Sequence, residues 1–244
     1  MSGHSKWHNI QKTKGAQDAK RASMFTKISK EMIVAVKEGG SADPANNSRL
    51  ATVITKAKAA NMPNDNIKRV LDKASGAGNT DNYESITYEG YGPSGVAVIV
   101  ETMTDSRNRT AANMRHYFDK YGGNLGASGC VAWSFDRKGV LVIDNEEEEL
   151  EEDTVMMDAL DAGAEDFSNE GECFEITTDP DDFNAVADAL TAKGYSFVSA
   201  QVEMVPQNYQ KLEKEEDIKN MEKLLDMMED DDDVQNVWHN WDNE

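Results

Sequence analysis

Apolar residues in the first part of the chain recur at the spacing of α-helices. A first helix is predicted over about residues 17–38, with apolar side chains on one stripe and lysines on the opposite side. A pair of glycines ends it, and two shorter helices follow on either side of Pro63. The pattern predicts a small helical bundle over residues 1–78. The core stripe of its first helix comprises Phe25, Ile28, Met32, Ala35 and Val36.

After the glycine-containing linker at 76–79, the hydrophobic pattern changes from helical to strand-like. Two strands and a helix are expected, followed by a glycine-rich loop and a further strand at 130–135. This ββαβ series lacks the elements that would close its core. The two strands are expected at 86–89 and 96–102, and a polar turn at 103–110 caps a helix that carries Ala111, Met114, Phe118 and Tyr121 on one face.

Residues 139–205 alternate in the order βαββαβ, which is typical of a ferredoxin-like domain. The tail that follows has one helix over 212–228 and one strand over 234–238, which are too few to form a core. We therefore expect a multidomain α+β protein, in which a helical bundle precedes two further domains. These are an α+β domain formed by 79–135 plus 206–244, and a ferredoxin-like domain, 136–205, inserted into it.

The composition excludes several classes of protein. The longest apolar run, Val96 to Val100, is far shorter than the ~20 residues of a membrane span. The first residues have no apolar segment of the kind found in secretory signals. Two cysteines, Cys130 and Cys173, are too few for a disulfide framework. We expect a cytoplasmic protein with no membrane partner.

Charge divides the chain of 244 residues into two unlike parts. Residues 1–75 carry fourteen basic and six acidic residues, a net charge of +8. The remainder carries eleven basic and forty acidic residues, a net charge of −29. The N-terminal part should therefore attract polyanions, and the rest should repel them.

Basic residues on an N-terminal arm and on one side of the first helix can neutralise phosphates. Trp7 and His8 could stack on a base, or Trp7 could anchor the arm to the core. Two arginines in the turn before the next domain's helix oppose the helix dipole, so each should have a phosphate or carboxylate partner. The candidate nucleic-acid-binding residues are Lys6, Trp7, His8, Lys12, Lys14, Lys20, Arg21, Lys27, Lys30, Arg107 and Arg109.

No pattern in the sequence indicates an enzyme, a metal site, a cofactor or a small-molecule substrate. The loop at 122–129 is rich in glycine, but it precedes a strand and lacks the GK[ST] of a P-loop, so a tight turn is expected. The acidic runs at 146–153 and 229–233 lack the spacing of a calcium loop. The four histidines form no metal-binding pair with one another or with the cysteines.

Several segments resemble the YebC/PmpR family, in order and over essentially the whole chain. They include Gly3-His4-Ser5-Lys6-Trp7, the stretch 57–63, the turn 105–110, the loop 122–126 and the segment 232–237. The resemblance implies a helical first domain, an α+β second domain and a ferredoxin-like third domain inserted into the second. It also implies a DNA-binding regulator of transcription. Relatives include a mitochondrial translational activator of cytochrome c oxidase subunit I, and bacterial members are linked to stalled ribosomes.

Three functions remain open at this point. The chain could be a DNA-binding regulator, a ribosome-associated translation factor that binds rRNA, or an acidic protein-interaction scaffold. DNA and rRNA both present phosphates, so the basic residues do not distinguish them. No coiled coil or dimer stripe is evident, so we expect a monomer.

Overall fold

The computed structural model describes residues 18–76, 82–145 and 150–242. The chain forms two compact units, and each is made of two separate stretches of sequence. The first unit comprises residues 1–79 and 137–203, and the second comprises 80–136 and 204–244. The chain therefore passes from the second unit to the first within strand β4 (Phe135–Asp144) and returns within β7 (Ser199–Pro206).

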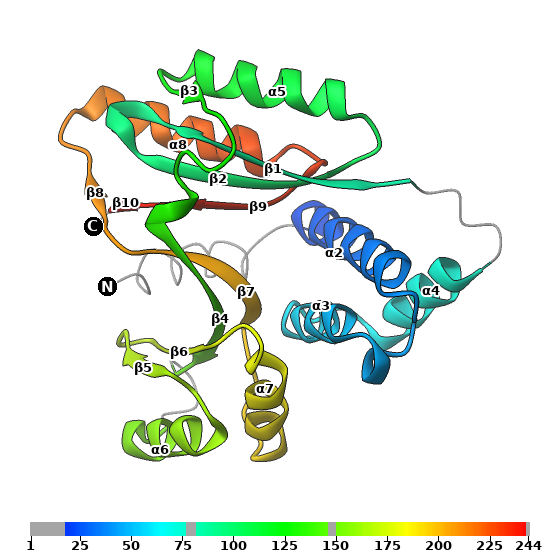
Figure 1. The fold of residues 1–244 in the computed structure, drawn as a ribbon. Coiled ribbons are helices and arrows are strands. Elements are labelled where there is room, and N and C mark those ends of the chain that lie inside the picture. Colours follow the sequence, from blue (N-terminus) through cyan, green and yellow to red (C-terminus); the bar gives the residue numbers. More distant parts are fainter. Residues whose placement is uncertain (1–17, 77–81, 146–149, 243–244) are drawn as a thin grey trace. The chain divides into compact units, whose positions relative to one another are not determined.

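The N-terminal part of the first unit is a helical bundle (Figure 1). Its helices are α2 (Asp18–Gly39), a short 3-10 turn (Pro44–Asn46), α3 (Ser48–Ala59) and α4 (Asn64–Ser75). The stripe expected from the sequence forms the core, with Ile28, Met32 and Ala35 fully or almost fully buried against Leu50 and Ala57. The bundle predicted from helical periodicity is confirmed.

A buried asparagine fixes the turn between α2 and α3. The Asn47 Oδ1 atom accepts a hydrogen bond from the backbone N–H of Leu50 at 3.1 Å, which caps the start of α3. Its Nδ2 atom donates to the carbonyls of Ala35 at 2.8 Å and Ser41 at 2.9 Å. Because this cap lies at Asn47, α3 begins at Ser48.

The second part of the first unit has the order β4, α6, β5, β6, α7, β7. Its sheet has the strand order β5-β6-β4-β7, which is that of a ferredoxin-like fold. Leu141, Ile143 and Phe174 from the sheet pack against Val155 of α6 and Val186 of α7. The elements not yet bounded are α6 (Glu152–Ala162), β5 (Asp166–Asn169), β6 (Cys173–Thr178) and α7 (Phe183–Ala192). The predicted ferredoxin-like fold is confirmed.

The two parts of the first unit are in contact. Helix α7 lies against α3, and the Asn184 Nδ2 atom donates to the Thr52 hydroxyl at 3.0 Å. Ala59 at the end of α3 is part of the ferredoxin-like core.

The second unit is a four-stranded sheet with the order β3-β1-β2-β9, covered on one face by α5 and α8 (Figure 1). Alternate residues of β2 point to opposite faces, so Val98 and Val100 meet the helices while Ile99 meets Phe135 on the other side. The elements are β1 (Glu84–Tyr91), β2 (Ala97–Thr104), α5 (Arg107–Lys120), β3 (Asn124–Leu125), β8 (Gln210–Lys211), α8 (Glu215–Glu229), β9 (Val234–His239) and β10 (Trp241–Asp242).

The expected strand over residues 130–135 is wrong. Residues 132–134 form a 3-10 turn, and the strand starts at Phe135 and continues through 144 as β4. The backbone N–H groups of Val131 and Ala132 donate to the Glu89 carboxylate, so they are not available for a strand ladder.

Candidate nucleic-acid interface

Five of the eleven candidate residues fall on a part of the chain that the structure does not describe. Lys6, Trp7, His8, Lys12 and Lys14 lie outside the described residues. Lys20 belongs to α2, but its side chain also lies outside them. As nucleic-acid contacts, these six positions and the other five candidates stay predictions.

The other α2 candidates lie off the core stripe of the helix. Arg21 is exposed, while Lys27 and Lys30 are partly exposed and each interacts with other residues. Glu31, in contrast, is buried and accepts a hydrogen bond from the Lys56 ammonium at 2.7 Å. This acid of α2 is thus directed inward and pairs with a base of α3.

Three further bases of the bundle are exposed and were not among the candidates. They are Lys58 at the end of α3, and Lys68 and Arg69 on α4. None of them forms a salt bridge within the part of the chain that the structure describes. The helical period could have identified the α4 pair, because both residues lie off the stripe formed by Ile67, Val70 and Leu71.

Arg109, in the first turn of α5, has carboxylate partners. Its Nη2 atom lies 2.7 Å from Asp233 Oδ2 and 2.9 Å from Asp105 Oδ1. Asp233 is buried and also accepts hydrogen bonds from the hydroxyls of Thr104 and Thr110, each at 3.0 Å. Of the two partners that the sequence left open for this arginine, the structure supplies the carboxylate.

The protonation states of this cluster follow from its contacts. Burial alone would raise the pKa of Asp233, but the hydrogen bonds from Arg109, Thr110 and Thr104 outweigh it and lower the pKa below its usual range. The hydrogen bonds from Asp233 and Asp105 raise the pKa of Arg109. Asp233 is therefore a carboxylate and Arg109 a cation at neutral pH, and the pair holds the start of α5 to the start of β9.

A second carboxylate of the acidic tail also binds α5. The Asp231 Oδ2 atom accepts hydrogen bonds from Asn113 at 3.1 Å and from the Tyr117 hydroxyl at 2.9 Å. Burial and the bond to Asp231 raise the pKa of Tyr117 to about 12. Part of the acidic run at 229–233 is thus structural.

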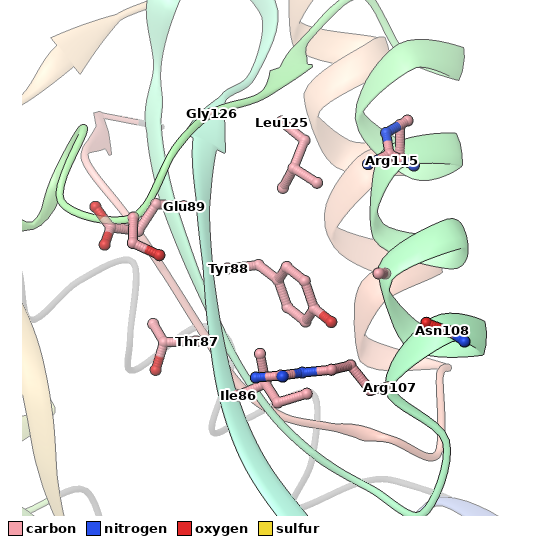
Figure 2. Close-up of a pocket in the computed structure, with 11 residues that line it drawn as sticks. Ile86, Thr87, Tyr88, Glu89, Arg107, Asn108, Arg115, Leu125 and Gly126 are labelled. Carbon is pink, nitrogen blue, oxygen red and sulfur yellow. The ribbon is translucent and has the colours of Figure 1, made fainter.

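Arg107 differs from Arg109, because it is directed toward a groove between α5 and β1 (Figure 2). The groove has a volume of about 400 Å³ and is lined by Ile86, Tyr88, Arg107, Ala111, Arg115 and Leu125, among others. Arg107 is 70% exposed, and its Nε atom lies 4.0 Å from Glu84. This loose contact leaves the guanidinium accessible to an external anion.

The glycine-rich loop holds a carboxylate of the protein itself. The Glu89 side chain accepts hydrogen bonds from the backbone N–H groups of Gly129 at 2.6 Å and of Val131 and Ala132 at 2.9 Å. Burial alone would raise the pKa of the Glu89 carboxyl. The three backbone hydrogen bonds outweigh the effect of burial, so the pKa is lowered from its usual value. Positive φ angles at Gly122 and Gly129 confirm the tight turn expected there.

Glu89 was missed because no local pattern connects it with a loop forty residues later.

Neither a metal-binding cluster of His, Cys, Asp and Glu nor a helix able to cross a membrane occurs within residues 18–76, 82–145 and 150–242.

Comparison with known proteins identifies the family to which the chain is similar. The N-terminal domain of the TACO1/YebC family matches residues 5–77, and the family's second and third domains match 83–241. A probable transcriptional regulatory protein of Ruminiclostridium cellulolyticum is 57% identical over 99% of this chain and 96% of its own. One of Finegoldia magna is 57% identical over the whole of both chains.

A solved structure has the same fold. The crystal structure of a conserved hypothetical protein from Aquifex aeolicus matches with a TM-score of 0.81 and 40% identity, over 92% of this chain and 91% of the other. This neighbour thus shares the α+β fold described above. The chain belongs to the TACO1/YebC family.

Proposed function

We propose that the protein is a nucleic-acid-binding regulator of gene expression that contacts phosphates through its basic helical domain, residues 1–78. Its relatives are named probable transcriptional regulatory proteins, which supports a regulatory role. The observation that carries the binding step is the separation of charge, +8 over residues 1–75 against −29 over the remainder.

The fold of the bundle supports this proposal. A single core buries the apolar stripes of α2, α3 and α4, and their other faces carry bases. Arg21, Lys58, Lys68 and Arg69 are exposed, and none forms an ion pair with a described residue. Such side chains neutralise phosphates without reading bases, so affinity should depend on the salt concentration more than on sequence.

Charge reversal tests the binding step. The variant in which Lys12, Lys14 and Lys20 become Glu should lose nucleic-acid binding. A matched control, Lys211, Lys214 and Lys223 to Glu, makes the same charge change on exposed positions of the second unit. The measurement is the dissociation constant for duplex DNA and for an rRNA fragment as a function of salt.

The wild-type affinity should fall with a log–log slope of about −0.7 to −0.9 per phosphate neutralised. Equal losses in both triple variants would show that the basic domain has no special role. Sequencing the nucleic acid crosslinked to the protein in cells then identifies the target. Promoter DNA would indicate a transcriptional regulator, and rRNA would indicate action on the ribosome.

A further inference from the structure

The outer edge of strand β1 is paired over only part of its length by the residues that the structure describes. On one side it pairs with β2 along its whole length, from Glu84 to Tyr91. On the other side, among the residues that the structure describes, it pairs only with β3, at Gly90 and Tyr91. The segment 84–89 is therefore the edge of the sheet, and Ser85 and Thr87 on this segment are exposed.

The direction of the backbone groups on this edge follows from one hydrogen bond. The carbonyl of Glu89 accepts from the N–H of Gly126 at 2.8 Å, so Glu89 directs its backbone groups toward the β3 side. In an antiparallel ladder, every second residue has the same direction. Thr87 and Ser85 therefore present their N–H and C=O groups outward, as a template for another strand.

A stripe of α5 lies above this edge. Arg107, Ala111 and Arg115 are spaced i, i+4, i+8 and line the groove beside Ile86 and Tyr88 (Figure 2). The small side chain of Ala111 leaves room between the two arginines. Arg115 is exposed and forms no salt bridge with any residue that the structure describes. The two arginines are separated by about 12 Å along the helix axis.

We propose that this groove binds an extended segment of a partner protein, which adds to β1 as a further strand and directs acidic side chains at the two arginines. Along a strand, residues i and i+4 share a face and lie about 13 Å apart. Two carboxylates with this spacing match Arg107 and Arg115, and an apolar residue between them meets Ala111.

The charge of the second unit favours a short peptide over a nucleic acid strand. Residues 80–136 and 204–244 carry twenty acidic and eight basic residues, and their only arginines are Arg107, Arg109 and Arg115. A polynucleotide would bring one negative charge per nucleotide to a surface that is negative overall. A strand with two carboxylates needs only the two arginines, and it gains backbone hydrogen bonds that a nucleic acid cannot make.

The test uses the full chain and two synthetic peptides of one composition. The in-register probe is Thr-Glu-Thr-Val-Thr-Glu-Thr, with both glutamates on one face. The control is Thr-Glu-Thr-Val-Glu-Thr-Thr, with the glutamates on opposite faces. A heptamer of uridine is the third probe. NMR titration of the ¹⁵N-labelled protein measures the affinity of each probe and the shifts of the Ser85 and Thr87 amides.

The in-register peptide should bind at least tenfold more tightly than the control peptide and should shift both amides. Arg107→Glu and Arg115→Glu should each weaken its binding at least tenfold, whereas Lys120→Glu, the same change outside the groove, should not. Thr87→Pro removes one outward N–H at an edge position that tolerates proline, and it should also weaken binding, while Thr87→Ala should not.

Two results would overturn the proposal. One is equal binding of the two peptides. The other is arginine-dependent binding of the uridine heptamer with no shift of the Thr87 amide, which would identify the groove as a phosphate site. Neither result affects the proposed role of the basic domain, because none of the variants changes residues 1–78.

Discussion

Single carboxylates organise the second unit at points where its elements meet. Glu89 binds three backbone N–H groups of one loop, and Asp233 binds Arg109 and two threonine hydroxyls at the start of α5. Each replaces several hydrogen bonds to water with bonds to fixed donors. Removing such an acceptor leaves buried donors unpaired, which costs more than the bond itself contributes.

Asp233→Asn should therefore destabilise the second unit by about 2–3 kcal/mol. Hydrogen exchange of the β2 amides measures this free energy without assuming that the whole chain unfolds in one step. Asp230→Asn is the matched control, because Asp230 is exposed at the end of α8. A similar loss in both variants would contradict a specific role for Asp233.

The same carboxylate has a defined pH dependence. Its pKa is lowered in the folded chain, so its contribution is fully present above its unfolded pKa of about 4. The contribution is lost as the pH falls through the lowered folded value. Exchange protection of β2 should decrease in this acid range in the wild type, and it should decrease less in Asp233→Asn.

His239, at the end of β9, should make the stability of the second unit depend on pH in a range above that of Asp233. Burial lowers its pKa from 6.5 to about 4, and its Nδ1 atom accepts the backbone N–H of Trp241 at 3.2 Å. The neutral form is favoured in the folded state, so stability is present above pH 6.5 and is lost as the pH falls toward 4.

The loss should reach about 3 kcal/mol, because one pKa unit corresponds to 1.36 kcal/mol. His239→Asn keeps an acceptor but does not titrate, so its stability should change less between pH 6.5 and 4. Hydrogen exchange of β9 at several pH values compares the two proteins. Parallel curves would show that His239 is not the group responsible.

At the scale of elements, hydrophobic periodicity predicted those helices and strands whose buried residues are close to one another in sequence. The stripes of α2, α3 and α4 and the βαββαβ order follow directly from the positions of residues such as Ile28, Leu50 and Leu141. The prediction of a strand at 130–135 was wrong. Its apolar residues Val131 and Phe135 are both buried, but they lie on either side of a 3-10 turn over Ala132–Ser134 and not along a strand. The acceptor that stabilises this turn lies on β1, beyond the reach of any local pattern.

The same limit applies to the candidate site. The two arginines of the turn at 105–110 look alike in sequence. Arg109 is distinguished from the accessible Arg107 by its contacts with Asp105, four residues earlier, and with Asp233, which is distant in sequence. Arg115 was missed because the groove that gives it significance needs β1 beside α5. The helical periodicity could have identified Lys58, Lys68 and Arg69 as exposed bases, but they were overlooked.

A prediction about elements concerns the two stretches that build the second unit. Its core contains Val98 and Phe118 from the first stretch, and Met221, Leu224 and Val234 from the second. A fragment of residues 80–136 should therefore not fold alone, and adding residues 204–244 as a separate chain should restore dispersed amide resonances. Dispersed resonances from residues 80–136 alone would contradict this shared core.

At the scale of the whole molecule, opposite charges are tethered to one another. We expect the acidic residues to compete with phosphates for the basic domain. A fragment of residues 1–78 should then bind random-sequence DNA at least tenfold more tightly than the full chain at low salt, a difference of about 1.4 kcal/mol. The gap should narrow as the salt concentration rises, because screening weakens the competition.

Fluorescence anisotropy with one labelled duplex, measured from low to physiological salt, compares fragment and full chain. A full chain with Glu229, Asp230 and Asp232 neutralised is the control for the competing acids, because it leaves the structural carboxylates Asp231 and Asp233 in place. If fragment and full chain bind equally at every salt concentration, the acidic part does not regulate binding.

The chain crosses between the two units twice, in β4 and in β7, and this also determines the order in which its parts can fold during synthesis. Strand β2 pairs with β9 across more than 130 residues, as in the match of Glu101 with Asn236. On a translating ribosome, the ferredoxin-like part can therefore fold while β2 still lacks its partner. Until the last forty residues emerge, the nascent chain then exposes the edge of β2 that later pairs with β9, and the face of β2 that carries Val98 and Val100 lacks α8. Premature termination would leave a folded insertion carried by an unfolded host, which is a substrate for chaperones and proteases.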